Sequence, residues 1–210
     1  MTEAASVTRR EQFAMETRKL IFDTAVDLFA EKGYDSVTVD DICEKAGVAK
    51  GTFYNHFKSK DQIIVEEFLK IDAYYGEILS KLQKKKKSYI DKMNEFFALT
   101  LRYISEQGIE IMKVAYHSQI GRSRTSSPVA SPKRPLYEIV ELLVKEGQDN
   151  GEVRADMSAA VITQTLVHFT RGVVYDWCLQ NGGFDLEQAG RDYFKLVLDG
   201  LQPVSHELLI

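Results

Sequence analysis

The sequence predicts an all-α protein of about nine helices, with a three-helix helix-turn-helix module over residues 1–60 and a larger helical domain over residues 61–210. Apolar residues recur every three or four positions along most of the chain, and no segment alternates as a strand would. With 210 residues, 44% of them hydrophobic, the chain can form a sizeable core and is too apolar to be disordered. Its length fits one compact unit as well as a small module plus a larger one.

The first helix is predicted over about residues 13–32, and Gly33 follows it as a stop signal. Its inward stripe consists of Leu20, Ile21, Ala25, Leu28 and Phe29. The polar residues before position 13 predict a mobile arm.

A short second helix is predicted to begin after Thr38, whose side chain can cap it while Asp41 reaches back as in a capping box. Val39, Ile42 and Ala46 share one face of this helix. Gly47 then stands where the chain must turn, because glycine adopts the left-handed conformation that ends a helix without a steric cost.

The third helix follows the turn, and Phe53 and Phe57 lie four residues apart on its inward side. The remaining arc is small, polar or cationic. It comprises Lys50, Gly51, Thr52, Tyr54, Asn55 and His56. Such a mixture suits a helix that enters the major groove of DNA, where cations meet phosphates or guanine and glycine permits close approach. A solvated basic face on an ordinary surface helix is the alternative.

Residues 33–63 resemble the signature of TetR-family transcriptional regulators without a gap. The matching positions are Gly33, Thr38, Val39, Ile42, Ala46 to Val48, Gly51, Thr52, Tyr54, His56, Phe57, Ser59 and Lys60. Ala49 departs from the Ser or Thr common in the family, and Cys43 departs from Ala. Together with the open arc of the third helix, the resemblance predicts a set of DNA contacts with Lys60 as a phosphate contact. The set is Thr38, Lys50, Gly51, Thr52, Tyr54, Asn55, His56 and Lys60.

The charge balance confines any DNA contact to a local patch. The net charge is −4, but residues 45–60 hold four lysines and no acid. Arg9 and Arg10 in the N-terminal arm either follow DNA or belong to a frayed terminus. Cys43 and Cys178 form no metal-ligand or disulfide pattern, so we expect a reduced cytoplasmic protein without metal or cofactor. The sequence contains no signal peptide and no apolar run long enough to span a membrane. It also contains no known catalytic motif, which argues against an enzyme.

A long helix is predicted to start at a capping box of Ser59 and Gln62, and its apolar positions repeat with helical period. It joins the two domains and can therefore act as a lever. It ends in the four lysines of residues 84–87, which form either a solvated terminus or a second phosphate-binding patch.

Further helices are predicted over 89–107, 109–120 and 136–148. Residues 121–135 contain three of the four prolines and only basic charges, which predicts a flexible connection able to gate a pocket.

The last two helices, over about 157–180 and 185–201, carry apolar residues on more than one face. Such helices must be covered on both sides, which predicts a homodimer formed through them. A helix pair buried wholly within one chain is the alternative.

The family resemblance also implies a small-molecule pocket in the C-terminal domain. Its candidate wall residues are Phe97, Tyr103, Met112, Tyr116, His117, His168, Tyr175 and Trp177. Each fits a place in the hydrophobic core equally well.

These observations together predict a sequence-specific regulator of transcription, namely a repressor released from a palindromic DNA operator when a small molecule binds. The alternatives are a DNA-binding protein without a ligand and an all-helical enzyme.

Overall fold

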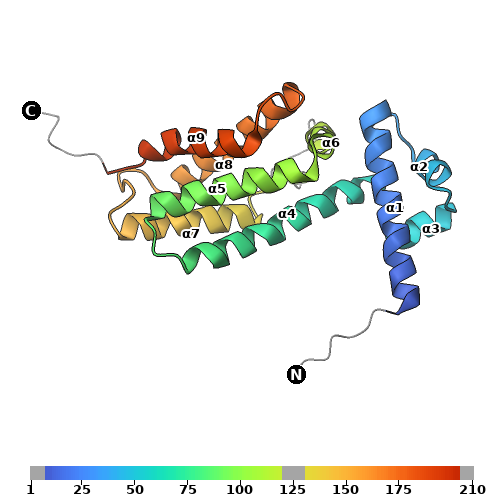
Figure 1. The fold of residues 1–210 in the computed structure, drawn as a ribbon, viewed down its shortest axis with the longest axis horizontal. Coiled ribbons are helices and arrows are strands. Elements are labelled where there is room, and N and C mark those ends of the chain that lie inside the picture. The colour runs from blue at the N-terminus through green and yellow to red at the C-terminus, as the bar shows by residue number, and fades with distance from the viewer. Residues whose placement is uncertain (1–7, 120–130, 204–210) are drawn as a thin grey trace, which may run out of the picture.

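The computed structural model describes residues 8–119 and 131–203, and these ranges contain nine α-helices and no strand (Figure 1). The predicted all-α fold is therefore confirmed. The helices are α1 (Arg9–Lys32), α2 (Val39–Ala46), α3 (Lys50–His56), α4 (Lys60–Gln83), α5 (Tyr89–Gln107), α6 (Ile109–Gln119), α7 (Pro135–Asp149), α8 (Ala159–Leu179) and α9 (Leu186–Asp199). None of the helices in the described ranges is both long and apolar enough to cross a membrane.

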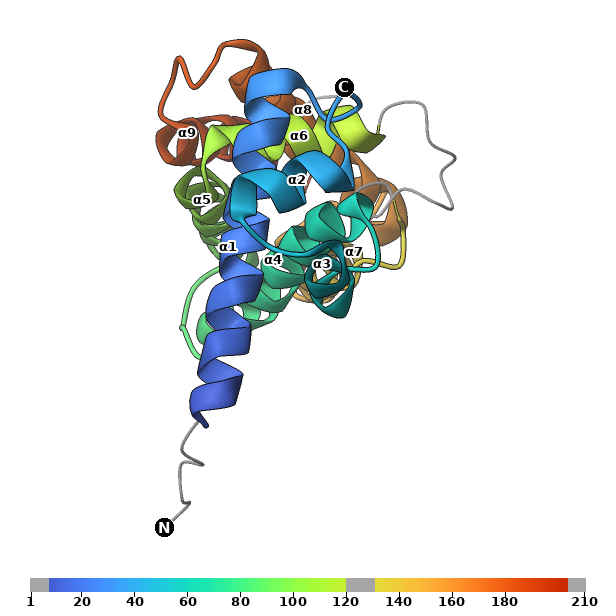
Figure 2. The ribbon, with the colours of Figure 1, turned by 90° about the vertical axis from the view of Figure 1, so that its right-hand side faces the viewer.

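Helices α1 to α3 form a small unit at one end of the molecule (Figures 1 and 2). Its centre is fully buried and consists of Ile21, Ala25, Ile42 and Phe53. Helix α1 starts at Arg9, four residues before the predicted start, because Thr8 caps it in a capping box with Glu11. The predicted mobile arm is therefore wrong for residues 8–12, and residues 1–7 lie outside the described ranges.

Helix α4 runs from this unit into the larger bundle formed by α5 to α9 (Figure 1). The predicted Ser59 cap is absent: Ser59 makes no side-chain capping bond, and Gln62 instead accepts a hydrogen bond from the backbone N–H of Lys58. At the far end of α4, Lys85 and Lys87 both pair with Glu95 of α5. This end lies away from α2 and α3, which favours the solvated terminus over a second phosphate-binding patch.

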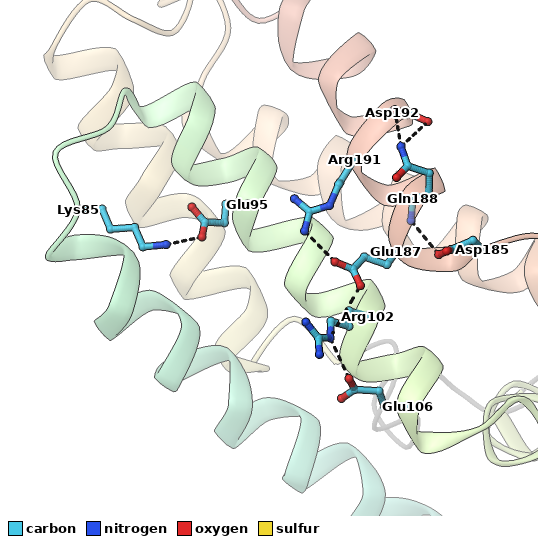
Figure 3. Close-up of polar contacts among 9 residues, drawn as sticks. All are labelled: Lys85, Glu95, Arg102, Glu106, Asp185, Glu187, Gln188, Arg191 and Asp192. Carbon is cyan, nitrogen blue, oxygen red and sulfur yellow. Dashed lines mark hydrogen bonds and ion pairs between the residues drawn. The ribbon is translucent and has the colours of Figure 1, made fainter.

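Helices α5 and α9 pack closely along their length. Phe97 stacks on Phe194 with ring centroids 4.0 Å apart. Gly190 permits this approach, since a Cβ at this position would lie 2.8 Å from the Leu101 side chain. Charged side chains line the outside of the same seam, where Arg102 pairs with Glu106 and Glu187, and Glu187 also pairs with Arg191 (Figure 3). These exposed pairs contribute little stability.

The predicted connection at 121–135 is only partly described, because residues 120–130 lie outside the described ranges. Its last residues are not flexible as predicted: Arg134 is buried, and Pro135 opens α7 at a position where a helix tolerates proline.

Candidate DNA-binding surface and effector site

The turn between α2 and α3 is built as the sequence predicts. Thr38 and Asp41 form the capping box, and the hydrogen bonds from Thr38 lower the pKa of the Asp41 carboxyl. Gly47 ends α2 in the left-handed conformation, with φ 67° and ψ 31°. The backbone N–H of Val48 then donates to the carbonyl of Cys43 at 3.0 Å. These bonds fix the angle at which α3 leaves the turn.

Helix α3 has one buried side and one open side. Phe53 and Phe57 are buried, whereas Tyr54 is 50% exposed. The other predicted DNA-contacting residues of α3 also lie outside the core: Lys50, Gly51 and Asn55 are exposed, and Thr52 and His56 are half-buried. Thr38 is exposed at the start of α2. Figure 2 looks onto the end of the molecule that carries this surface.

Two features of the α3 surface bear on DNA approach. A Cβ built on Gly51 meets no atom within 4 Å, so the structure leaves space for a larger residue there. Lys50 Nζ lies 2.8 Å from Asp40 Oδ1, and the hydrogen bond to Asp40 raises the pKa of Lys50. Lys50 is therefore held in its charged form at the open edge of α3.

Lys60 does not fit its predicted role as a phosphate contact. Its Nζ donates to the backbone carbonyls of Tyr34 at 2.7 Å and Val37 at 3.0 Å. The same ammonium lies 4.3 Å from the centre of the Tyr34 ring. Lys60 thus holds the turn between α1 and α2. Lys58, two residues earlier, is exposed.

Arg18 of α1 joins the end of α3 to α4, a role that the sequence pattern did not indicate. Its guanidinium donates to the carbonyl of His56, pairs with Glu66 and lies 4.4 Å from the Phe57 ring centre. A groove of about 480 Å³ opens beside it between α1 and α4. Arg18 therefore links the last residue of α3 to the helix that enters the larger domain.

The eight predicted pocket residues do not form one site. Phe97 and Trp177 belong to the core, where Trp177 Nε1 donates to the carbonyl of Phe184 at 3.1 Å. Tyr103 stacks on Tyr74 at 4.2 Å. His117 is exposed and lies 4.0 Å from Asp35.

His168 and Tyr175 are exposed on α8, and only Met112 and Tyr116 of the predicted set line the same internal cavity. Helical spacing places residues on a face but does not tell which faces converge.

The internal cavity has a volume of about 40 Å³ and lies among α4, α5, α6, α7 and α8. Its lining combines apolar residues with a buried polar cluster. The residues are Ile71, Tyr75, Ile104, Met112, Tyr116, Arg134, Leu136, Thr170, Arg171 and Val174. Burial raises the pKa of the Tyr75 and Tyr116 hydroxyls, and Tyr116 donates to the carbonyl of Arg171 at 3.2 Å.

Arg134 is the most unusual member of this lining. Its guanidinium meets the carboxylate of Asp72 on α4 through Nη2–Oδ1 at 2.8 Å and Nε–Oδ1 at 3.0 Å. The two side chains are only 8% and 12% exposed. The sequence predicted a flexible segment here, and nothing local signals a partner 62 residues away.

Helices α8 and α9 carry most of the exposed large apolar side chains in the described part of the C-terminal domain. Leu179 is 66% exposed and Leu196 is 76% exposed, and Val161, Tyr175 and Tyr193 are also open. A groove of about 620 Å³ runs between these helices. It is lined by His168, Phe169, Gly172, Val173, Asp176, Phe184, Tyr193, Leu196 and Val197.

The described residues offer no cluster of three metal-binding side chains. Cys43 and Cys178 are free thiols, and burial raises the pKa of Cys178 to about 11. At neutral pH this thiol is almost wholly protonated, so it is a poor nucleophile.

Two family models match the chain. The model described as bacterial regulatory proteins of the tetR family matches residues 21–66, and the model described as the C-terminal region of YsiA-like protein matches residues 70–200. The HTH-type transcriptional repressor KstR2 of Mycolicibacterium smegmatis is 26% identical over 197 residues, which cover 88% of this chain and 90% of that relative.

Solved structures share the fold. The fatty acid degradation regulator FadR from Bacillus halodurans matches with a TM-score of 0.72 and 23% identity, covering 88% of this chain and 96% of that chain. Thermus thermophilus FadR, a TetR-family repressor in complex with lauroyl-CoA, matches with a TM-score of 0.67 and 20% identity. That match covers 92% of this chain and 98% of the Thermus chain.

Proposed function

The chain belongs to the TetR family of bacterial transcriptional regulators, and we propose that it works as a homodimeric repressor on an inverted-repeat operator. It releases this DNA when a long-chain acyl compound, such as an acyl-CoA, binds in the C-terminal domain. Both events take place in the cytoplasm. The observation that carries the proposal is the two-sided α3, with Phe53 and Phe57 in the core and Tyr54 and Lys50 open at the end of the molecule.

The DNA surface consists of the exposed arc of α3 and the start of α2. Tyr54, Thr52 and Asn55 supply hydrogen bonds to base edges, and Lys50 supplies a cation that can leave the exposed Asp40 for a phosphate or guanine. The remaining contacts are Thr38, Gly51 and His56. Lys58 takes the phosphate role in place of Lys60, because the Lys60 ammonium is bound to backbone carbonyls.

Dimerisation through α8 and α9 accounts for the apolar surface there. Leu196 is 76% exposed in one chain, so the apolar faces of this helix pair are not buried wholly within that chain. A twofold dimer also presents two α3 helices to two half-sites. Specific binding requires both helices, because one short α3 contacts only a few base pairs.

The effector enters where the polar cluster meets apolar walls, around Tyr116 and Met112. The lauroyl-CoA complex of the Thermus relative motivates an acyl compound as its class. The cavity of about 40 Å³ has room for no more than a few water molecules, so an effector must separate the surrounding helices in order to bind. Such a separation moves α4, which also contacts the DNA-binding unit through Glu66 and Arg18.

Selection from a random pool of DNA duplexes tests the DNA half of the proposal. We expect an inverted repeat to be enriched, and Tyr54→Ala to weaken its binding by about 1–3 kcal/mol if Tyr54 contacts a base edge. The proposed surface would be contradicted if the selected duplexes contained no palindrome. It would also be contradicted if Tyr54→Ala and Thr52→Ala both bound the selected DNA as tightly as the wild type.

Mobility shift on the selected duplex with added lauroyl-CoA tests the effector half, with coenzyme A alone as the control. Release by lauroyl-CoA but not by coenzyme A is the expected result. If no acyl compound changes the affinity for DNA, the ligand-independent alternative takes its place.

A further inference from the structure

The ion pair of Asp72 and Arg134 joins two elements that are far apart in sequence. Asp72 lies in the middle of α4, and Arg134 immediately precedes α7. Both side chains are at least 88% buried, and Arg134 borders the internal cavity. Two phenols, those of Tyr75 and Tyr116, line the same small space. Apart from Arg134, the buried polar side chains in the described ranges are one lysine and four threonines, so an ion pair buried on both sides is unusual in this core.

Stability alone does not explain the pair. Removing two charges from water costs about as much as their attraction returns, and apolar residues of the same size are often equally stable. Leu136 and Val174 already surround the site with apolar side chains. A buried guanidinium beside a cavity is therefore better explained as part of a binding site.

We propose that Arg134 binds an anionic group of the effector, and that Asp72 occupies this position while the protein is free of ligand. This inference rests on the proposed function. Arg134 Nη2 donates to Asp72 Oδ1 at 2.8 Å and Nε reaches Oδ2 at 3.3 Å, and a carboxylate or a phosphate of a ligand can offer the same pair of oxygens. The effector is thus an amphiphilic anion, with its apolar part against Ile71, Ile104 and Met112. The anionic group comes from a free fatty acid or from the phosphates of a CoA ester.

The exchange of partners also gives a force that acts on α4. Once the ligand holds Arg134, Asp72 is a buried carboxylate without its cation, and such a charge is strongly unfavourable. The carboxylate is relieved either by taking up a proton or by moving toward water or another donor, and the second route displaces α4. Because α4 also carries Glu66, the partner of Arg18, this movement is transmitted to the DNA-binding unit.

Titration calorimetry without DNA tests the inference with two matched pairs of probes. Dodecanoate is compared with 1-dodecanol, which lacks the carboxylate, and lauroyl-CoA is compared with S-lauroyl-pantetheine, which lacks the phosphates. We expect the wild-type protein to prefer the anion in one pair by roughly 10- to 100-fold, as for a hydrogen-bonded charge. The pair that shows the preference identifies the source of the anionic group.

The variants then assign the preference to Arg134. Arg134→Gln should abolish it, and Asp72→Asn should bind the anion on the order of tenfold more tightly because the internal competitor has lost its charge. The double variant Asp72→Asn/Arg134→Gln keeps a neutral hydrogen-bonding pair. It should therefore remain folded even if Arg134→Gln alone does not. Like Arg134→Gln, it should bind the anionic and the neutral probe equally well. Arg102→Gln, the same change at an exposed ion pair on α5, serves as the control and should keep the wild-type preference (Figure 3).

An anion preference that persists in the double variant would overturn the inference, and so would the failure of all four probes to bind. A parallel release assay with operator DNA separates this result from the proposed function. Release by lauroyl-CoA that is equal in the wild type and in the double variant leaves the proposed function intact and removes the inference. An Arg134-dependent preference without DNA release supports the inference and contradicts the proposed control by the effector.

Discussion

Two lysines that lie two residues apart, just after α3, have different roles. Lys60 donates to the carbonyls of Tyr34 and Val37, whereas Lys58 is exposed. We expect Lys60→Met to lower the free energy of unfolding by about 1–3 kcal/mol, because two backbone carbonyls lose a charged donor. Lys58→Ala should instead leave stability unchanged within about 0.5 kcal/mol.

DNA binding at several salt concentrations distinguishes the two lysines further. Lys58→Ala should reduce the magnitude of the slope of log affinity against log salt concentration by roughly one unit, because one phosphate contact is lost. Urea unfolding provides the matching stability measurement. The assignment is wrong if Lys60→Met lowers the salt slope while its stability remains that of the wild type.

Ala49 leaves the start of α3 without a side-chain cap. Its backbone is extended, with φ −70° and ψ 149°, as an N-cap residue requires, but no side-chain oxygen meets the free N–H groups. Ala49→Ser should therefore raise the free energy of unfolding by about 0.5–1 kcal/mol. The control is Ala30→Ser, an exposed position inside α1, where serine should be neutral or slightly unfavourable. Equal effects of the two serines in urea unfolding would rule out a capping contribution.

At the scale of elements, Arg18 connects α1, α3 and α4. Arg18→Met keeps the aliphatic stem and removes the donors to His56 and Glu66. We expect the affinity for operator DNA to fall several-fold, because the end of α3 is no longer held to α4. Effector affinity measured without DNA should change little, since Arg18 lies outside the internal cavity.

Lys19→Met is the matched control for Arg18→Met. Lys19 is the next residue along α1, and its side chain is 76% exposed and paired with Asp23 on the surface. Its loss should leave DNA affinity within about twofold. Equal losses in the two variants would mean that the overall positive charge of α1, rather than the link to α4, supports DNA binding.

The elements that the sequence predicted well are those whose signals are local. The capping box of Thr38 and Asp41 and the left-handed Gly47 fix α2 and its end within ten residues, and both appear as predicted. The start of α1 is determined by an equally local capping box of Thr8 and Glu11, although the helical periodicity begins only near residue 13. Periodicity identified the apolar faces of the long helices, but Leu20, predicted in the inward stripe of α1, is 49% exposed.

The features that escaped prediction depend on distant partners. Arg134 belongs to a proline-rich segment with only basic charges, yet it is ordered by Asp72, 62 residues away. The Lys60 ammonium turns inward, where the carbonyls of Tyr34 and Val37 in the turn between α1 and α2 accept its hydrogen bonds. Which aromatic faces converge on a cavity is likewise decided by the angles between helices, and these are not encoded in the spacing.

At the scale of the whole molecule, the proposed dimer depends on the apolar surface of α8 and α9. Leu196→Lys places a charge in the middle of that surface and should give a monomer with the 23.9 kDa mass of one chain, instead of twice that mass. The folded monomer should lose little stability, because Leu196 is 76% exposed before assembly. Operator affinity should fall sharply, since each half-site is then bound separately.

Leu142→Lys is the control for the dimer test, because Leu142 is also an exposed leucine, 37% accessible, but lies on α7. Light scattering should show a dimer for this variant. A dimer in Leu196→Lys, or a monomer in both variants, would place the interface elsewhere.

If operator DNA and effector both act on the position of α4, each must weaken the binding of the other by the same factor. Thermodynamic linkage requires that an effector which weakens DNA binding by a given factor is itself bound more weakly, by the same factor, when DNA is present. For a coupling of typical size this factor is roughly 5- to 150-fold. Titration of lauroyl-CoA into the free dimer and into the dimer saturated with operator DNA measures one side, and titration of DNA with and without lauroyl-CoA measures the other.

If lauroyl-CoA instead releases DNA by separating the subunits across α8 and α9, the apparent factor will depend on protein concentration. A movement of α4 within an intact dimer predicts a factor that is independent of concentration, and any systematic change over a tenfold range of protein would contradict that mechanism.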